Sequence, residues 1–290
     1  MAECFRYFAA LCQTDHPNPL HRSEMKRKTE SMVQMLENAV IGYAPFMPVR
    51  LVVFPEFGHA APAYVTLKEL REHLAVPIPN EHTDRMQSKA KEFGLYIQTA
   101  SLLESDEKWP GAVFNTTCLI GPEGILYKYR KVNPWIPWEV HTSPHDIEGY
   151  DEELFPVAKT PIGNIGAAIC YDWLFPETLR QLAAKGAEIL VRVSAYMDPF
   201  GTTEPMDWWT VVTDAGSRIS VTWWPSTKGP ASSITLPFRG PVGAWRWIST
   251  EGFWSRRHPV RRTDFVVAPI DIQALREARK CVGPIKCWHI

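Results

Sequence analysis

Short apolar segments alternate with amphipathic segments through the first two-thirds of this 290-residue chain. The apolar segments have the length of buried strands, and the segments between them have the three-to-four-residue periodicity of helices. We expect strands at Phe5–Leu11, Leu51–Phe54, Leu95–Ala100, Val113–Ile120, Ile125–Tyr129, Ile165–Ile169 and Ile189–Val193, and helices at His21–Ile41, Glu81–Glu92 and Pro176–Lys185. This alternation predicts an α/β domain with apolar strands buried between helices.

Composition narrows the class of protein further. Hydrophobic residues make up 45% of the chain and charged residues 22%, which is enough for a sizeable core. The formal net charge of −1 gives no electrostatic reason to expect a nucleic acid or an anionic membrane as partner. No apolar run is long enough to span a bilayer. Because no linker or internal repeat is apparent, we expect a single domain over residues 1–290.

The N-terminus lacks the features of a signal peptide, so the expected location is the cytoplasm. Six cysteines are too few and too scattered for a disulfide-stapled secreted fold of this length. The pattern Cys281-x5-Cys287-x-His289 superficially suggests a metal site. Structural zinc needs four ligands at tighter local spacing, so no metal is predicted.

Three chemically active residues share one topological feature. Glu56 follows the strand LVVF and a proline, Lys131 follows the strand ILYKY, and Cys170 follows the strand IGAAI. Ligands of α/β sheets bind beyond the carboxyl ends of strands, so these side chains can converge there. A cysteine at a strand-to-helix turn has the geometry of an exposed nucleophile elbow.

Each residue also has a structural explanation. Cys170 alone is typical of a small buried hydrophobe. Glu56 alone could cap a turn, and Lys131 belongs to a basic patch that is typical of a solvated surface. The coincidence of acid, amine and thiol at three strand ends is what favours catalysis.

The segments VVFPEF, KYRKVNPW and AAICYDWLFPETLR, in this order and spacing, resemble the three signature segments of the nitrilase superfamily. The resemblance covers residues 5–212 and 264–279 and implies an αββα sandwich. The stretches KYRKVNPWIPWE and AAKGAEILVRVSAYMDP are most similar to the aliphatic amidase and formamidase branch. In that branch a second glutamate follows the lysine at the offset that Glu139 occupies here.

The resemblance implies acyl transfer from a small amide through a thioester. Glu56 is then the general base, Cys170 the nucleophile, and Lys131 with the backbone N–H of Tyr171 the oxyanion donors, while Glu139 orients the lysine or the water. No metal or organic cofactor is required, and a homo-oligomer is expected by family analogy. Candidates for the walls of the substrate pocket are Trp135, Trp138, Trp173 and Tyr196.

Two alternatives stay open. A nitrilase would use the same triad to make an acid and ammonia from a nitrile. A non-catalytic homologue or an interaction scaffold would retain the strand-end residues without activity, and a Trp- and Arg-rich segment could then bind a partner protein.

Residues 213–262 break the pattern. This stretch contains five tryptophans and seven arginines with almost no strand or helix periodicity, where the resemblance requires a helix and two strands. In a shifted reading frame, Thr222–Gly229 permits Val-Val-Ala-Val-Asn-Gln-Gly, which resembles the expected strand. The tail near 280–290 behaves likewise. We hypothesise a compensated frameshift at 213–262 and a second one near 280, which would compromise the last quarter of the fold.

Overall fold

Two β-sheets form the centre of the molecule. The computed structural model describes residues 6–14, 19–135, 139–195, 224–228, 231–236, 246–249 and 264–281. The first sheet has seven strands, in the order β13 (Asp264–Asp271), β1 (Arg6–Gln13), β2 (Val49–Val53), β3 (Tyr96–Gln98), β5 (Phe114–Gly121) and β4 (Leu102–Glu104), with β6 (Gly124–Arg130) also paired to β5. Strand β1 pairs in parallel with β2 and antiparallel with β13, so the two ends of the described chain meet in one sheet.

The second sheet has six strands. Their order is β12 (Arg246–Ser249), β11 (Ala231–Leu236), β10 (Trp224–Lys228), β9 (Ile189–Val193), β8 (Gly163–Ile169) and β7 (Val157–Thr160). Strands β8 and β9 run parallel, and their register pairs Ile169 with Val193. Residues that follow these two strands therefore emerge side by side at one edge of the sheet.

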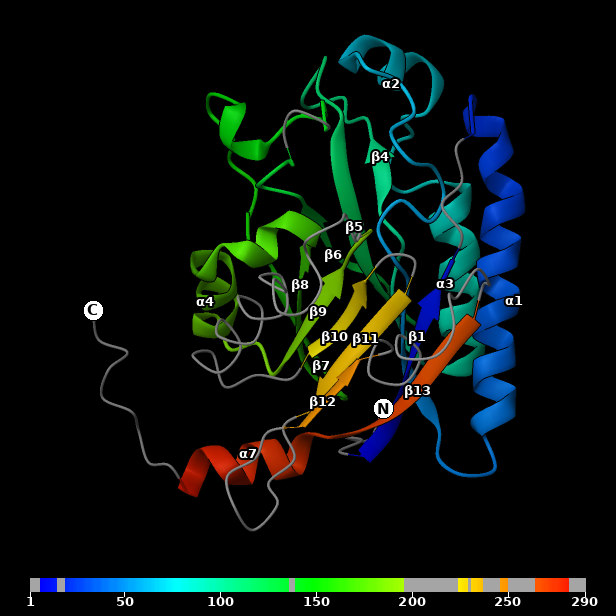
Figure 1. The fold of residues 1–290 in the computed structure, drawn as a ribbon, viewed down its shortest axis with the longest axis vertical. Coiled ribbons are helices and arrows are strands. Elements are labelled where there is room, and N and C mark those ends of the chain that lie inside the picture. Colours follow the sequence, from blue (N-terminus) through cyan, green and yellow to red (C-terminus); the bar gives the residue numbers. More distant parts are fainter. Residues whose placement is uncertain are drawn as a thin grey trace, which may run out of the picture.

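Helices cover the outer face of each sheet. Helices α1 (Met25–Tyr43) and α3 (Glu81–Phe93) pack on the first sheet, and α4 (Pro176–Ala184) packs beside the second, as Figure 1 shows. Two further helices are α2 (Leu67–His73) and α7 (Ile272–Cys281), and short 3-10 turns lie at η1 (Arg22–Glu24), η2 (Pro144–Asp146) and η3 (Cys170–Leu174). One apolar core lies between the sheets, and a second lies between the first sheet and its helices. The predicted αββα sandwich is confirmed.

Local sequence explains where the helices begin and end. The Asn80 side chain accepts hydrogen bonds from two backbone N–H groups of the first turn of α3. Gly94 ends that helix at φ 61°, a left-handed conformation that costs glycine little. Helix α4 begins at Pro176, whose missing N–H is not needed in a first turn.

The predicted strands and helices of the first two-thirds are all present, within a few residues at their ends. Helix α2 and the short strands β4 and β7 were not indicated by periodicity. Inside the aberrant segment 213–262, periodicity predicted no strands, yet the backbone of β10, β11 and β12 extends the second sheet there. These three strands were therefore not indicated by periodicity.

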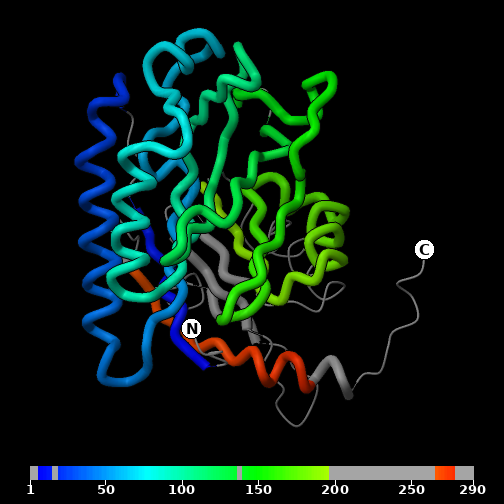
Figure 2. Tube along the Cα trace, turned by 180° about the vertical axis from the view of Figure 1, so that it is seen from behind, coloured from blue at the N-terminus to red at the C-terminus, as the bar shows by residue number. Residues whose placement is uncertain are grey.

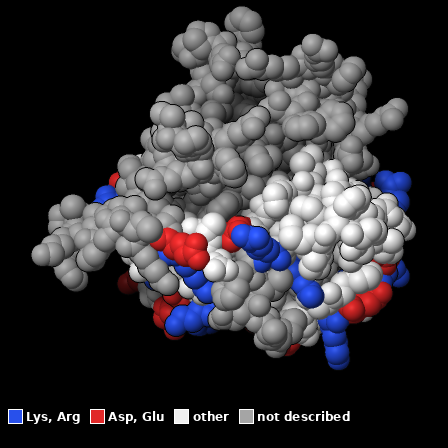
Figure 3. Space-filling model, turned by 90° about the horizontal axis from the view of Figure 1, so that it is seen from below, with Lys and Arg blue, Asp and Glu red and all other residues white. Residues whose placement is uncertain are grey.

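The C-terminal helix α7 follows β13 and runs along one end of the molecule, away from α1 and α3 (Figure 2). On the described part of the face shown in Figure 3, basic and acidic side chains lie interspersed. Among the described residues, no helix is long and apolar enough to cross a membrane.

Candidate active site

Glu56 follows strand β2 and is 1% exposed. Its Oε1 accepts hydrogen bonds from Asn115 Nδ2 at 2.8 Å and from Lys131 Nζ at 3.0 Å. Its Oε2 accepts the backbone N–H of Ala195, which follows β9, at 2.9 Å. One buried carboxylate therefore joins the ends of strands from both sheets.

Lys131 follows strand β6 and is fully buried. Its Nζ lies 2.8 Å and 2.7 Å from the two carboxylate oxygens of Glu139, in addition to its contact with Glu56. The backbone N–H of Trp135 donates to Glu139 Oε2, which holds that carboxylate in place. A single ammonium is thus shared between two buried carboxylates, as charge burial requires.

Cys170 lies at the carboxyl end of β8, where the strand turns into η3. Its φ is +46°, and Phe57, directly after Glu56, has a φ of +56°. These are the two non-glycine residues with positive φ in the described ranges. Strained backbone of this kind clusters at functional sites, and at Cys170 it produces the sharp elbow expected for a nucleophile.

Burial and charge set the protonation of this polar cluster. Burial raises the pKa of Glu56, and the nearby Glu139 raises it further, although Lys131 acts in the opposite direction. Burial would lower the pKa of Lys131, but the charges of Glu56 and Glu139 outweigh it, so the pKa is raised and the amine stays protonated. For Glu139, burial acts to raise the pKa, but the contact with Lys131 prevails and the pKa is lowered.

Cys170 lies close enough to this cluster for its charges to act on the thiol. Burial, followed by the charge of Glu56, raises the pKa of Cys170 to about 12, while Lys131 lowers it. The resting group is therefore a thiol, which needs a base before it can attack a carbonyl carbon. Glu56, with its raised pKa, is the carboxylate suited to that task.

The structure brings together Glu56, Lys131, Glu139 and Cys170. The other predicted site residues lie in different environments. Tyr171 is half-buried and its ring packs edge-on against Phe175, with 5.3 Å between ring centroids. Trp173 is 0% exposed in the core between the sheets, where its indole N–H donates to the carbonyl of Ala168. Trp135 is half-buried. The two remaining candidates, Trp138 and Tyr196, lie outside the described residues.

Sequence reasoning missed two residues at the site. Asn115 donates to Glu56, and its backbone carbonyl accepts the N–H of Lys131 at 2.9 Å. Asp172 accepts four hydrogen bonds from segments beside Lys131 and Cys170. A buried amide at the start of the strand Phe114–Gly121 was the available signal for Asn115, and a carboxylate two residues after the cysteine was the signal for Asp172.

Two buried histidines follow Glu56 and Glu139 closely in the sequence. His141 is 4% exposed, two residues after Glu139, and His59 is 1% exposed, three residues after Glu56. Among the described residues, neither ring nitrogen of either histidine has a hydrogen-bond partner. Burial lowers the pKa of His141 to about 4, and burial together with the nearby His82 lowers that of His59 to about 3. Both rings are therefore neutral near pH 7.

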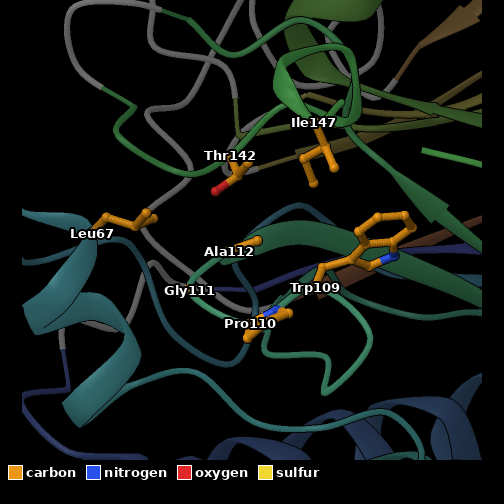
Figure 4. A pocket seen from close by; sticks show the side chains of 7 residues that line it. All are labelled: Leu67, Trp109, Pro110, Gly111, Ala112, Thr142 and Ile147. Atoms are coloured by element: carbon orange, nitrogen blue, oxygen red, sulfur yellow. The ribbon is translucent and has the colours of Figure 1, made fainter. Parts of the chain in front are cut away.

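An open pocket lies outside this cluster. Its wall includes Leu67, Trp109, Thr142 and Ile147, with Leu67 and Ile147 on opposite sides (Figure 4). None of the four clustered residues lines it. In the described ranges, no three His, Cys, Asp or Glu side chains are grouped to hold a metal ion. Two members of the superficial metal pattern, Cys287 and His289, lie outside those ranges.

Comparison with known proteins identifies the family. The sequence profile of the carbon–nitrogen hydrolases matches residues 8–218. The chain is 31% identical over 192 residues to a formamidase of Bacillus cereus (strain Q1), covering 66% of this chain and 54% of that protein. It is 30% identical over 192 residues to a formamidase of Bacillus anthracis (strain A0248), with the same coverage. The chain therefore spans about half the length of these curated relatives.

Solved structures share the fold. Nit3 of Saccharomyces cerevisiae, a member of branch 10 of the nitrilase superfamily, aligns over 98% of this chain and 97% of its own, with a TM-score of 0.70 and 19% identity. An amidase variant from Nesterenkonia AN1 aligns over 95% of each chain, with a TM-score of 0.61 and 16% identity. The protein belongs to the carbon–nitrogen hydrolase family of the nitrilase superfamily, near its amidase and formamidase branch.

Proposed function

We propose that this protein hydrolyses a small aliphatic amide to a carboxylic acid and ammonia through a thioester on Cys170. The observation that carries the proposal is the buried Lys131 ammonium, held at 3.0 Å from Glu56 and 2.7 Å from Glu139, beside a thiol at a strained strand end. A polar cluster of this kind is costly to bury, and ionisable groups with perturbed pKa values cluster at functional sites.

The first half-reaction forms the thioester and releases ammonia. Glu56 takes the proton of Cys170 as the sulfur bonds to the amide carbon, and the carbonyl oxygen becomes an oxyanion. The Lys131 ammonium and the backbone N–H of Tyr171 stabilise that oxyanion, each contributing about 3–4 kcal/mol in comparable sites. When the C–N bond breaks, Glu56 returns the proton to the departing nitrogen, which leaves as ammonia.

The second half-reaction restores the enzyme. Glu56 takes a proton from water as the water oxygen bonds to the thioester carbon. The C–S bond then breaks, and the proton returns to the Cys170 sulfur while the carboxylic acid leaves. Protons and bonds balance without an external oxidant or reductant, and the scheme requires no metal or organic cofactor. Glu139 keeps Lys131 charged and oriented through both of its oxygens.

Relatives support a small substrate. The curated relatives are named formamidases, and an amidase from Nesterenkonia carries the acetamide moiety of fluoroacetamide on its active-site cysteine. We therefore infer a short acyl group, with Trp135, Trp138 and Tyr196 as candidates for the residues around it. By family analogy we also propose a homo-oligomer.

Ammonia release from formamide, acetamide and propionamide tests the proposal, with acetonitrile and propionitrile as matched nitriles. Release from amides that disappears in Cys170→Ala supports it. Cys118→Ala is the matched control, because that thiol is buried in the other core and faces no catalytic group. Release from nitriles alone would assign a nitrilase. If a soluble, monodisperse protein releases no ammonia from any of these compounds, a non-catalytic homologue is favoured.

A further inference from the structure

The Asp172 carboxylate is fully buried and accepts four hydrogen bonds. Its Oδ2 accepts the Tyr129 hydroxyl at 2.7 Å and the backbone N–H of Ile169 at 3.1 Å. Its Oδ1 accepts the backbone N–H of Asn133 at 2.8 Å and that residue's side-chain amide at 3.0 Å. All four donors are neutral, so none of these contacts is an ion pair.

The positions of these donors along the chain are informative. Tyr129 and Asn133 flank Lys131 at two residues on either side. Ile169 directly precedes Cys170. The Asp172 carboxylate therefore binds the chain on both sides of Lys131. It also binds the residue directly before Cys170. These two segments belong to different sheets, since β6 lies in the first and β8 in the second.

The bond between Ile169 and Asp172 also closes the turn around Cys170. An L-residue stays in the left-handed region, here at a φ of +46°, only where its surroundings hold it there. The Ile169 N–H to Asp172 Oδ2 contact spans that residue from the strand to η3. Loss of the carboxylate removes the closure of the elbow and the link to the lysine segment together.

We propose that Asp172 is a positioning residue that fixes the separation of the Lys131 ammonium and the Cys170 sulfur. This inference rests on the proposed amide hydrolysis, because it assigns to those two groups the oxyanion donor and the nucleophile. Asp172 itself touches neither reacting group. Its effect is therefore expected on kcat rather than on KM, since a misplacement of about 1 Å between reacting groups costs about 100-fold in rate.

A purely structural role is the alternative, and the chain offers a matched control. Glu188 is another buried carboxylate, at the opposite ends of the same strands β8 and β9. It accepts the Asn164 N–H at 2.9 Å and pairs with Arg276 at 2.7 Å. Glu188→Gln should cost stability without touching the separation of Lys131 and Cys170.

The experiment compares Asp172→Asn and Glu188→Gln in the full chain by two readouts. The first is kcat and KM for acetamide. The second needs no turnover: the rate at which iodoacetamide alkylates Cys170 at pH 8, followed by mass spectrometry of the peptide that contains it. For Asp172→Asn we expect kcat to fall about 100-fold with KM within about 3-fold, and alkylation to slow several-fold as Lys131 moves from the thiol. Glu188→Gln should keep both within about 2-fold of wild type.

The inference fails if Asp172→Asn retains wild-type kcat and alkylation rate while losing stability as Glu188→Gln does. If the wild-type protein releases no ammonia, the proposed function fails, but alkylation still decides whether Asp172 controls the thiol. Should Asp172→Asn not fold, Tyr129→Phe and Asn133→Ala remove single donors and leave the carboxylate. Each should lower kcat or the alkylation rate several-fold, and no change in either variant would overturn the inference.

Discussion

Glu139 holds Lys131 with both carboxylate oxygens, at 2.8 Å and 2.7 Å from the ammonium nitrogen. The contact is buried on both sides, with Lys131 0% and Glu139 8% exposed. Lys131 therefore has two counterions, and the one that is not the proposed base makes the shorter contacts. This division leaves Glu56 freer to exchange a proton.

We expect Glu139→Gln to lower kcat about 100-fold, because the lysine loses its orienting partner. Stability should fall by about 2 kcal/mol, the scale of a hydrogen bond to a charged group. Steady-state kinetics and thermal unfolding measure the two effects. Glu153→Gln is the control, since its pair with Lys185 is exposed and should change stability by no more than about 0.5 kcal/mol. Equal kinetics in both variants would contradict the assigned role.

A second prediction concerns acid stability. Burial lowers the pKa of His59 to about 3, with His82 adding to the effect, and lowers that of His141 to about 4. Unfolded histidine titrates near 6.5, so the unfolded chain takes up protons first as pH falls. Stability is therefore fully present above about pH 6.5, and each histidine removes about 1.4 kcal/mol per pH unit below it.

His59→Phe keeps an aromatic ring and removes one of these titrations. Between pH 7.5 and 5.0 the variant should lose about 2 kcal/mol less stability than the wild type. Urea unfolding at the two pH values measures the difference. An unchanged pH dependence would show that His59 is not buried as a neutral ring.

A third prediction separates thiolate formation from catalysis. Burial and then the Glu56 charge raise the pKa of Cys170 to about 12. Alkylation of Cys170 by iodoacetamide should therefore keep rising with pH beyond the value near 8.5 at which an ordinary cysteine levels off. Glu56→Gln removes one cause of the raised pKa of Cys170. Iodoacetamide should therefore alkylate Cys170 faster at pH 9 in this variant, while turnover is lost. Slower alkylation in this variant would count against the electrostatic account.

A fourth prediction concerns residues 213–262. A gene restored to the alternative frame in this segment should yield a protein with a higher melting temperature and a higher soluble yield. The reason is that apolar strand sequence would replace the Trp- and Arg-rich stretch in the second sheet. Differential scanning fluorimetry of both proteins tests this, and a restored protein that is no more stable would contradict it. An unambiguous read in the present frame, without a homopolymer slip, would exclude a sequencing error.

The sequence predicted most of the sandwich because buried strands have a strong local pattern. Runs such as Leu51–Phe54 and Ile165–Ile169 are apolar throughout, since both faces of their sheets are covered. Strands β4 and β7 have three and four residues, too few for a period to emerge. Helix α2 has seven residues and buries one of them, so it carries little amphipathic signal.

The four central residues of the site were predictable because each follows a recognisable segment. The local pattern did not predict the hydrogen bonds that link the site to residues distant in the sequence. Asn115 lies 59 positions from Glu56, and Asp172 lies 39 positions from Asn133. The first contact depends on the strand order within one sheet and the second on how the two sheets stack, and no local periodicity encodes either. An aromatic residue near a nucleophile is compatible with a pocket wall and with a core position, so the sequence could not distinguish the two for Trp173. In the structure its side chain is fully buried.

Every side chain of the polar cluster, and the backbone N–H that Glu56 accepts, comes from residues 56–195. The strands that complete both sheets at their far edges come from later in the chain. The reactive groups and the closing strands are thus encoded in separate stretches of the gene. A lesion in its last quarter can therefore disrupt the sheets while every residue of the polar cluster is preserved, so an inventory of these residues would score such an allele as intact.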